Sequence, residues 1–557
     1  MKEERLLKPR QDTSATSLTG FQLYPRGPRK SDARHPPGTL FPFRMFTSLP
    51  FPARRVTLLV GITACLALPA KSQHDVQRNA VQKIALGQHE QVPTILAGDK
   101  KPNAGKAETL FVETLNLAAQ GKIEEAISRR KLALATGLPL ERFVAGPRKV
   151  LSKLPPVEGS IDVELVHGPM VGAVTSEAAS FWVRTREPAT VTIRIGEKEF
   201  SNRTTAEADY TTVIRADGLK PMTTYAYRVL VNGKEIPAGQ TNLRTFPSRN
   251  KPQPFSVGFG GGAGYIPEWE RQWDNISTFQ PLAFLMLGDN VYIDQPEHSL
   301  CQHYCYYRRQ SRPEWRRFTA RTAIYSIWDD HDFGTNDCVP GPAIEKPAWK
   351  RKVWEIYRQN WVNPSYGSGE KQPGCWYDFM IGDVHFIMLD GRYYRDLKGG
   401  SMLGPVQKAW LRKTLTASSG TFKVIASPVP FSPRIKPGSK DPWDGFPEER
   451  AEIFSWIRKD RIEGVLLIAA DRHRTDLRTI PNDASYTLYE FESSRLTNRH
   501  THKVVKTDGL VWGYNKTCSF ALMQFDTTRP DPQVTFGLID IDGKRHHSHT
   551  LRRSSLK

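Results

Sequence analysis

Five short apolar runs, each ending abruptly in polar residues, constrain the fold of this chain more than any other feature. Uninterrupted apolar runs this short, bounded by turn residues, are typical of strands that are buried on both faces of a sheet. Such strands belong to mixed α/β domains, in which ligands bind beyond the carboxyl ends of the strands. The runs lie at residues 282–287, 323–328, 384–389, 422–426 and 465–470.

The residues that follow these runs carry the chemistry of a metal site. Asp329, Asp330, His331 and Asp332 follow the second run directly. Neighbouring carboxylates repel one another and are costly to desolvate, so a bound cation is the usual way to hold such a cluster. Carboxylate and imidazole groups suit hard or borderline divalent cations. The other runs deliver further polar residues to the same predicted edge, namely Asp289, Asp390, Arg392, Asp471 and His473.

Composition limits the classes of partner. The 557 residues are enough for about two to four domains, and 39% of them are hydrophobic. The net charge of +20 and the pI of about 9.6 would fit a nucleic-acid binder. However, no segment combines a dense Lys/Arg run with interleaved aromatic residues, so we expect no specific nucleic-acid recognition. A basic surface would instead attract anionic substrates, and we expect a monomer.

The first 72 residues have the composition of processing segments. Residues 1–44 are polar and basic, which predicts a disordered or unused extension. Residues 45–72 have the parts of a signal peptide, because a pair of arginines precedes an apolar run at 56–68 that is too short to span a bilayer. This predicts export to the periplasm or the extracellular space by a Sec or twin-arginine signal. The alternative is a lipoprotein box ending at Cys65, which would tether the protein to a membrane.

Two further segments precede the α/β domain. Residues 73–155 are predicted to be helical, with apolar residues at helical spacing in 107–120 and 123–136. We interpret them as a structural extension rather than as a partner-binding module. In residues 160–248, apolar and polar residues alternate over short stretches, as they do in the strands of a small β-sandwich. Tyr225 fits the tyrosine corner of a fibronectin type III domain.

The cysteines do not predict a structural zinc site. Of the six cysteines, none forms a CxxC pair. Cys301 and Cys305 lie four residues apart. They are compatible either with a disulfide in an oxidising compartment or with two free buried thiols.

Six motifs occur in a fixed order along the chain. They are GPMVGAVT (168–175), GDNVYID (288–294), WDDHDFGTND (328–337), LDGRYYRD (389–396), DPWDGFPEER (441–450) and ADRH (470–473). Through them the chain resembles the PhoD-like alkaline phosphatases, a branch of the calcineurin-like metallophosphoesterases. The resemblance implies an α/β (α+β) multidomain protein. Residues 253–545 would form a four-layer α/β/β/α metallophosphoesterase sandwich, preceded by the fibronectin-III-like β-sandwich and the helical segment.

The same resemblance implies a site for two metal ions and two side chains that act on the substrate. Besides Asp289, which would bridge both ions, the implied ligands are His473 on the first metal, Asp330 and Asp471 on the second, and either Tyr304 or Tyr307. A water activated by the metals would attack phosphorus. His331 would stabilise or protonate the leaving oxygen, and Arg392 would clamp the non-bridging oxygens through paired donors.

One position departs from the family pattern. The family has an iron-binding cysteine just after its first catalytic strand, where this chain has FGGGAGY at residues 259–265. We expect calcium together with iron or another transition metal. The missing thiolate argues against iron, and a harder ion or a single-metal site is the alternative.

The expected function is that of an exported metal-dependent phosphatase that hydrolyses phosphate monoesters. One alternative is a phosphodiesterase or phospholipase-D-like hydrolase, because the motifs do not separate monoesters from diesters. The other is an exported binding protein whose catalytic site has decayed. Retention of Asp289, Asp330, His331, Asp471 and His473 argues against decay.

Overall fold

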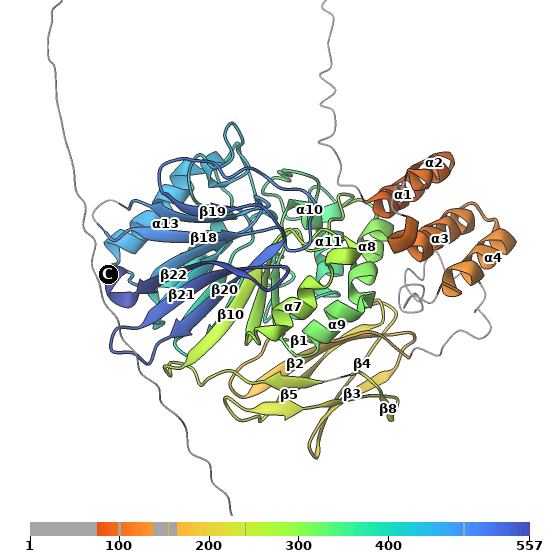
Figure 1. Ribbon diagram of the computed structural model, residues 1–557, viewed down its shortest axis with the longest axis horizontal. Coiled ribbons are helices and arrows are strands. Elements are labelled where there is room, and N and C mark those ends of the chain that lie inside the picture. The colour runs from red at the N-terminus through yellow and green to blue at the C-terminus, as the bar shows by residue number, and fades with distance from the viewer. Residues whose placement is uncertain (1–74, 99–101, 137–153, 155–163, 240, 483–484) are drawn as a thin grey trace, which may run out of the picture. The chain divides into compact units, whose positions relative to one another are not determined.

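The computed structural model describes residues 75–98, 102–136, 154, 164–239, 241–482 and 485–557, so the predicted leader segments lie outside the described residues. The first helices are α1 (Val76–Ala85), α2 (Val92–Ala97), α3 (Pro102–Ala119) and α4 (Ile123–Leu134) (Figure 1). Helices α3 and α4 confirm the two helices predicted from apolar spacing. No helix within the described ranges is long and apolar enough to cross a membrane.

A nine-stranded sheet forms one half of the α/β domain. Its strands in spatial order are β22 (Arg545–Arg552), β21 (Gln533–Asp540), β20 (Ser519–Asp526), β10 (Pro254–Gly260), β11 (Ala283–Leu287), β12 (Ala323–Ile327), β1 (Leu165–Gly172), β2 (Ala178–Thr185) and β5 (Thr211–Asp217). Strands β10, β11 and β12 run parallel to one another. Their carboxyl ends therefore meet at one edge of the sheet.

A seven-stranded sheet forms the other half. Its strands in spatial order are β13 (Tyr377–Ile381), β14 (Val384–Met388), β15 (Phe422–Ala426), β16 (Val465–Ala469), β18 (Leu488–Ser493), β17 (Thr475–Ile480) and β19 (Leu510–Tyr514). Strands β14, β15, β16 and β18 are parallel. The five strands predicted from apolar runs are all present, divided between the two sheets as β11, β12, β14, β15 and β16.

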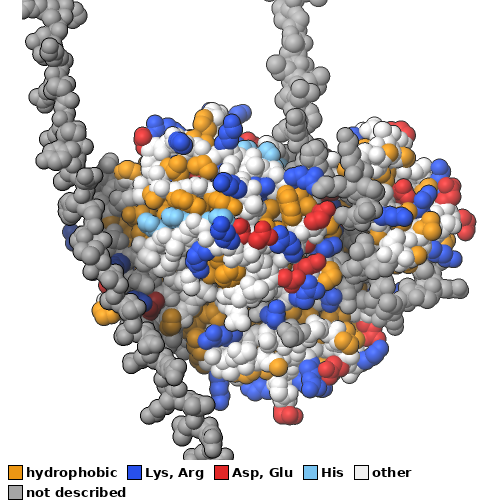
Figure 2. Space-filling model, viewed as in Figure 1, with side chains coloured by type: hydrophobic (Ala, Val, Ile, Leu, Met, Phe, Trp, Pro, Cys, Tyr) orange, Lys and Arg blue, Asp and Glu red, His pale blue; other side chains and the backbone are white. Residues whose placement is uncertain are grey.

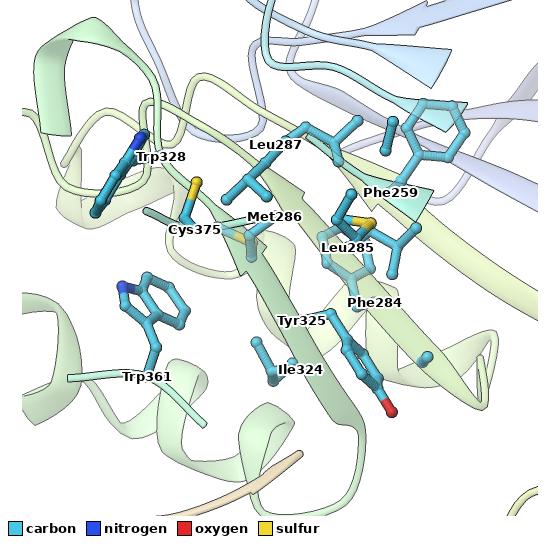
Figure 3. Close-up of a cluster of buried hydrophobic side chains, with 14 of the residues drawn as sticks. Phe259, Phe284, Leu285, Met286, Leu287, Ile324, Tyr325, Trp328, Trp361 and Cys375 are labelled. Atoms are coloured by element: carbon cyan, nitrogen blue, oxygen red, sulfur yellow. The ribbon is translucent and has the colours of Figure 1, made fainter. Parts of the chain in front are cut away.

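The two sheets contact each other through aromatic side chains. Phe525 of β20 packs edge-on against Phe386 of β14, with 6.0 Å between ring centroids. Phe536 of β21 stacks on Phe491 of β18 at 4.5 Å. Figure 3 shows the side chains of β11 and β12 gathered with Trp328 in one apolar cluster. Burial on both faces explains why these strands are apolar at nearly every position.

Helices pack against this pair of sheets, as a mixed α/β fold requires. They are α7 (Gln272–Thr278), α8 (Ser299–Ser311), α9 (Pro313–Thr319), α10 (Asp330–Phe333), α11 (Trp349–Arg358), α12 (Gly404–Thr416) and α13 (Pro447–Lys459). Phe318 of α9 lies 5.5 Å from Phe284 of β11, measured between ring centroids. Helices α12 and α13 confirm those predicted from the sequence. In α8, Cys301 and Cys305 are buried free thiols, so the disulfide alternative is wrong.

The β-rich segment shares a sheet with the α/β domain, whereas the sequence suggested a separate unit. Gly172 of β1 pairs with Ile324 of β12, so β1, β2 and β5 continue the nine-stranded sheet. The Tyr225 hydroxyl accepts a hydrogen bond from the Lys220 N–H at 2.8 Å, as predicted for the corner. The remaining strands form small sheets of their own: β3 (Thr190–Ile195), β4 (Lys198–Arg203), β7 (Arg228–Val231) and β8 (Lys234–Ile236) in one, β6 (Thr224–Ala226) and β9 (Asn242–Arg244) in another.

The positive charge of the chain is not concentrated on the visible face. Figure 2 shows Lys and Arg side chains dispersed among polar, acidic and apolar ones over the described part of this face. A nucleic-acid-binding surface would instead need basic side chains gathered in one stripe or groove.

Candidate active site

The first motif loop begins at a glycine that packs directly against the second motif. Gly288 follows β11 with φ +103°, and a Cβ at this position would lie 2.5 Å from the Cβ of Asp329. Asp289 then adopts a left-handed φ of +54°. Non-glycine residues in this region are strained, and they gather at functional sites. The ends of β11 and β12 therefore meet as closely as the backbone allows.

Asp332 joins the two motif loops rather than serving as a ligand. Its carboxylate accepts the backbone N–H groups of Asn290 and Val291, each at 2.9 Å. The Asp329 side chain caps helix α10, in which Asp332 lies. Burial raises the pKa of Asp332 to about 6, against the effect of these hydrogen bonds. Both oxygens of Asp332 thus serve to join the two loops.

Asp289, Asp330 and His331 converge as a metal site requires. One ligand atom from each lies within 4.8 Å of the other two. Burial, with the nearby carboxylates Asp330 and Asp329, raises the pKa of Asp289 well above its usual value. Burial also raises the pKa of Asp330, but the positive charges of Arg392 and His331 outweigh burial, so the pKa of Asp330 is lowered from its usual value. Two buried carboxylates at this separation are best stabilised by a cation.

The other predicted ligands come from the loop after β16. His473 Nε2 lies 3.7 Å from Asp289 Oδ2, so this histidine belongs to the same cluster. Asp471 lies close enough to raise the pKa of Asp329. Both Asp471 and His473 have left-handed backbones, with φ of +68° and +49°. The structure therefore brings Asp289, Asp330 and His473 together at one end of the two sheets, with the Asp471 carboxylate near that of Asp329.

Several buried polar atoms of this cluster have no hydrogen-bond partner among the described residues. They are Asp289 Oδ1, Asp329 Oδ2, Asp471 Oδ2 and His473 Nδ1. Leaving such atoms unpaired costs about 1–3 kcal/mol each, and more for a charged group. Free carboxylate oxygens and an imidazole nitrogen are the donor set that divalent cations take. The residues present therefore fit the metal ions expected for this site.

Neither tyrosine named from the sequence lies at the site, so that prediction is wrong. The Tyr304 hydroxyl donates to Glu108 at 2.9 Å, and the Tyr307 hydroxyl donates to Asp209 Oδ2 at 2.6 Å. The tyrosine at the site is Tyr292, whose hydroxyl donates to Asp289 Oδ2 at 2.9 Å and lies 3.3 Å from His473 Nε2. Its place three residues after Asp289 in GDNVY is the sequence signal that identifies it.

Arg392 does not have the geometry of a substrate clamp. Its side chain is fully buried, Nε donates to Asp329 at 2.5 Å, and Nη1 donates to Asp441 at 2.6 Å. Nη2 lies 3.7 Å from Asp330 Oδ1 and has no hydrogen-bond partner among the described residues. Two of the three guanidinium nitrogens are therefore already paired with carboxylates. This corrects the predicted role, because Arg392 joins the carboxylates of two loops, Asp329 and Asp441, and does not offer paired donors to a substrate.

His331 is oriented by a carboxylate of the first motif loop. Its Nδ1 makes a short hydrogen bond with Asp294 Oδ1, and its ring packs against that of Tyr292 at 4.7 Å. Burial disfavours the charged ring, but Asp294, Asp330 and Asp289 outweigh it and raise the pKa of His331 well above its usual value. With Nδ1 engaged, Nε2 is the nitrogen left for a substrate. A protonated imidazole held in this way can act as a general acid.

The glycine run explains the missing cysteine. Gly262 has φ +66°, and a Cβ there would lie 2.8 Å from Ser494 Oγ and 2.9 Å from the backbone N of Arg495. The segment after β18 fills this space, since Thr497 donates its backbone N–H to Gly262 O at 3.4 Å and its hydroxyl to Gly264 O at 2.6 Å. The backbone here therefore leaves no room for a side chain of any kind, a thiolate included.

Comparison with known proteins gives relatives of the same kind. Residues 258–546, more than half of the chain, match the family model described as PhoD-like phosphatase. Residues 162–249 match a domain of unknown function (DUF7800). The chain is 23% identical over 307 residues to alkaline phosphatase D of Bacillus subtilis (strain 168), an alignment that covers 47% of this chain. It spans only 52% of that relative's length.

Two solved structures share the fold. A structure of PhoD superposes with a TM-score of 0.55 at 15% identity, covering 68% of this chain and 91% of that one. The purple acid phosphatase PPD1 from yellow lupin (Lupinus luteus) seeds superposes with a TM-score of 0.54 at 11% identity, covering 70% of this chain and 75% of that one. The segment that matches the family model thus has the mixed α/β fold of these two phosphatases. From this fold, the acidic and histidine cluster and the match over residues 258–546, the chain belongs to the PhoD-like phosphatase family.

Proposed function

We propose that this chain is an exported metal-dependent phosphatase that hydrolyses phosphate monoesters. The observation that carries the proposal is the convergence of Asp289, Asp330 and His331, with His473 beside them, in a member of the PhoD-like family. Bound divalent cations would supply Lewis acidity and lower the pKa of a water, which phosphate ester hydrolysis requires. Export rests on the signal-like segment at residues 45–72.

The ligands of the two cations would be the clustered side chains, with a different tyrosine from the one first expected. Asp289, Tyr292 and His473 would hold one of the ions, since Tyr292 and His473 both lie beside Asp289. Asp330 and Asp471 would hold the other. Because Gly262 supplies no thiolate, we favour calcium with a harder partner ion over iron.

The chain's own groups would handle the leaving oxygen and the phosphate charge. His331 would give its Nε2 proton to the leaving oxygen while Asp294 holds Nδ1. Arg472, rather than Arg392, would contact the phosphate. It lies in the sequence between the predicted ligands Asp471 and His473. Its buried Nε has no hydrogen-bond partner among the described residues, and its Nη1 is 3.7 Å from Asp471. A guanidinium in this place would contact non-bridging phosphate oxygens.

Turnover of chromogenic esters tests the proposal. We expect the purified chain to hydrolyse p-nitrophenyl phosphate faster than bis(p-nitrophenyl) phosphate, to stop after chelation and to recover when divalent metal is returned. His331→Asn should lower kcat by about 10²- to 10⁴-fold. The control is His385→Asn, because His385 pairs with Asp378 and Ser418 and with none of the cluster.

The outcomes separate the alternatives. If the diester is hydrolysed faster than the monoester, the chain is a phosphodiesterase and not a phosphomonoesterase. Metal-independent turnover, or no turnover of either ester by protein that holds metal, would contradict the proposal, and the second result would favour a binding protein.

A further inference from the structure

Helix α1 lies outside the segment that matches the phosphatase family, yet its side chains contact the loop of the first catalytic motif. Arg78 Nη1 donates to the backbone carbonyl of Tyr292 at 3.1 Å and to Asp294 Oδ2 at 2.8 Å. One turn later, Gln82 donates to the Ile293 carbonyl at 3.2 Å. The arginine side chain is 3% exposed, so these bonds lie away from solvent.

The loop that α1 contacts is strained and needs external support. Tyr292 and Asp294 both have left-handed backbones, with φ of +53° and +56°. Non-glycine residues keep such conformations only where surrounding contacts fix them. On the inner side, the Asp294 N–H bonds to the His331 carbonyl at 3.2 Å. On the outer side, Arg78 and Gln82 of α1 donate to the carbonyls of Tyr292 and Ile293, and only Arg78 also bonds the Asp294 carboxylate.

Asp294 shares its two carboxylate oxygens between these neighbours. Oδ1 takes His331 Nδ1, and Oδ2 takes Arg78 Nη1. Asp294 is 21% exposed, so without the guanidinium its carboxylate could rotate toward water and release the imidazole. A carboxylate held at both oxygens fixes the direction of the ring. Loss of such an outer partner lowers activity or affinity about 10–100-fold at metal-binding histidines, and we take that range as the scale of the effect on His331.

We propose that Arg78 is a positioning residue for His331, and that helix α1 is thereby a part of the active site rather than a structural extension. This inference rests on the proposed function, since it assigns His331 the proton-donating role. It goes beyond the family comparison, because the matched residues begin at 258 and contain no counterpart of Arg78.

The same helix offers a matched control. Asp75, its N-cap, pairs with Arg308 of α8 at 2.6 Å, and this ion pair is more buried than that of Arg78, with the Asp75 side chain 9% exposed and the Asp294 side chain 21% exposed. Neither partner hydrogen-bonds to residues 292–294 or to His331 in the contacts among described residues. Asp75 Oδ1 also accepts the backbone N–H of Arg78 at 3.0 Å, and an asparagine keeps this cap, so Asp75→Asn weakens the docking of α1 without removing a bond to Asp294. Arg78→Met keeps the side-chain volume and removes the bonds to the loop, whereas Arg78→Lys keeps the charge.

The experiment measures kcat and KM for p-nitrophenyl phosphate with the full chain and saturating metal. It also follows the downfield N–H proton resonance of His331 in protein with ¹⁵N-labelled histidine, assigned by its loss in Asp294→Ala. We expect Arg78→Met to lower kcat about tenfold with KM changed less than twofold, and to shift the resonance. Arg78→Lys should recover most of the loss, and Asp75→Asn should leave kcat within twofold of the parent although it lowers Tm.

Two results would overturn the inference. One is an unchanged kcat and resonance in Arg78→Met. The other is an equal loss of kcat in Arg78→Met and Asp75→Asn, because it would show that α1 acts only by docking. If Asp75→Asn does not fold, Glu108→Gln in α3 serves as a control for general destabilisation of the helical segment, since Glu108 also bonds Arg308, at 3.2 Å. The resonance reports on the contact of Arg78 with the His331 site whether or not the chain hydrolyses the ester. Failure of the proposed function can therefore be told apart from failure of the inference about Arg78.

Discussion

Replacing Gly288 by alanine tests the close packing of the two motif loops on which the site depends. Backbone strain destabilises an alanine at φ +103° by about 1–3 kcal/mol. Its Cβ would also lie 2.5 Å from the Cβ of Asp329, so the two loops must separate, and overpacking of this kind costs about 1–3 kcal/mol more. We therefore expect Gly288→Ala to lower the free energy of unfolding by about 2–6 kcal/mol.

Gly341→Ala is the matched control. Gly341 has φ +85°, and a Cβ there would meet nothing within 4 Å, so only backbone strain of about 1–2 kcal/mol remains. Urea unfolding followed by tryptophan fluorescence gives both values. Separation of Asp289 from Asp330 should also lower kcat of Gly288→Ala about 100-fold, because a displacement near 1 Å has that effect. Equal destabilisation by the two substitutions, or full activity in Gly288→Ala, would refute the reasoning.

Three further predictions address individual side chains. Tyr292→Phe should lower bound metal and reduce kcat, whereas Tyr307→Phe should leave both unchanged; the reverse result would restore the tyrosine expected from the sequence. Arg392→Met should destabilise the fold by about 3–5 kcal/mol in urea, because it leaves the buried carboxylate of Asp329 without its guanidinium partner. Burial lowers the pKa of Lys423 to about 8, below its value of about 10.4 in the unfolded chain, so stability should rise by about 1–3 kcal/mol from pH 8 to pH 10.5. Lys423→Met should flatten that rise in pH-dependent urea unfolding, and an unchanged slope would contradict it.

The strands and most of the acidic cluster could be predicted because their signals are local. A strand buried on both faces must be apolar throughout, and Asp289, Asp330 and His473 follow such strands directly. Convergence at one edge then follows from the parallel order. The division of these strands between two sheets followed only from the family resemblance, since apolar runs carry no information about their partners.

The errors concern residues whose roles depend on distant partners. Tyr304 and Tyr307 lie in the sequence where a tyrosine ligand was expected, but in α8 their hydroxyls donate to Glu108 and Asp209. The carboxylates that occupy Arg392 come from two separate loops, one of them after residue 440. In both cases the sequence shows the side chain, and only the tertiary structure shows which acid lies beside it.

The contact of helix α1 with the first motif loop could not be predicted, for the same reason. Amphipathic spacing in α3 and α4 predicts helices but not what they pack against. The contact from Arg78 to Asp294 joins residues 216 positions apart in the chain. No local pattern distinguishes an arginine that supports a catalytic loop from one on a solvated helix face.

The most direct test of the central claim is elemental analysis of the purified full chain beside Asp289→Ala. If the clustered side chains hold a two-ion centre, the parent protein should contain about two equivalents of divalent or trivalent metal, with calcium among them. Asp289→Ala should lose most of this metal and all turnover while it keeps the circular dichroism spectrum of the parent. Parent protein without stoichiometric metal, or metal and turnover that survive the loss of Asp289, would contradict the account.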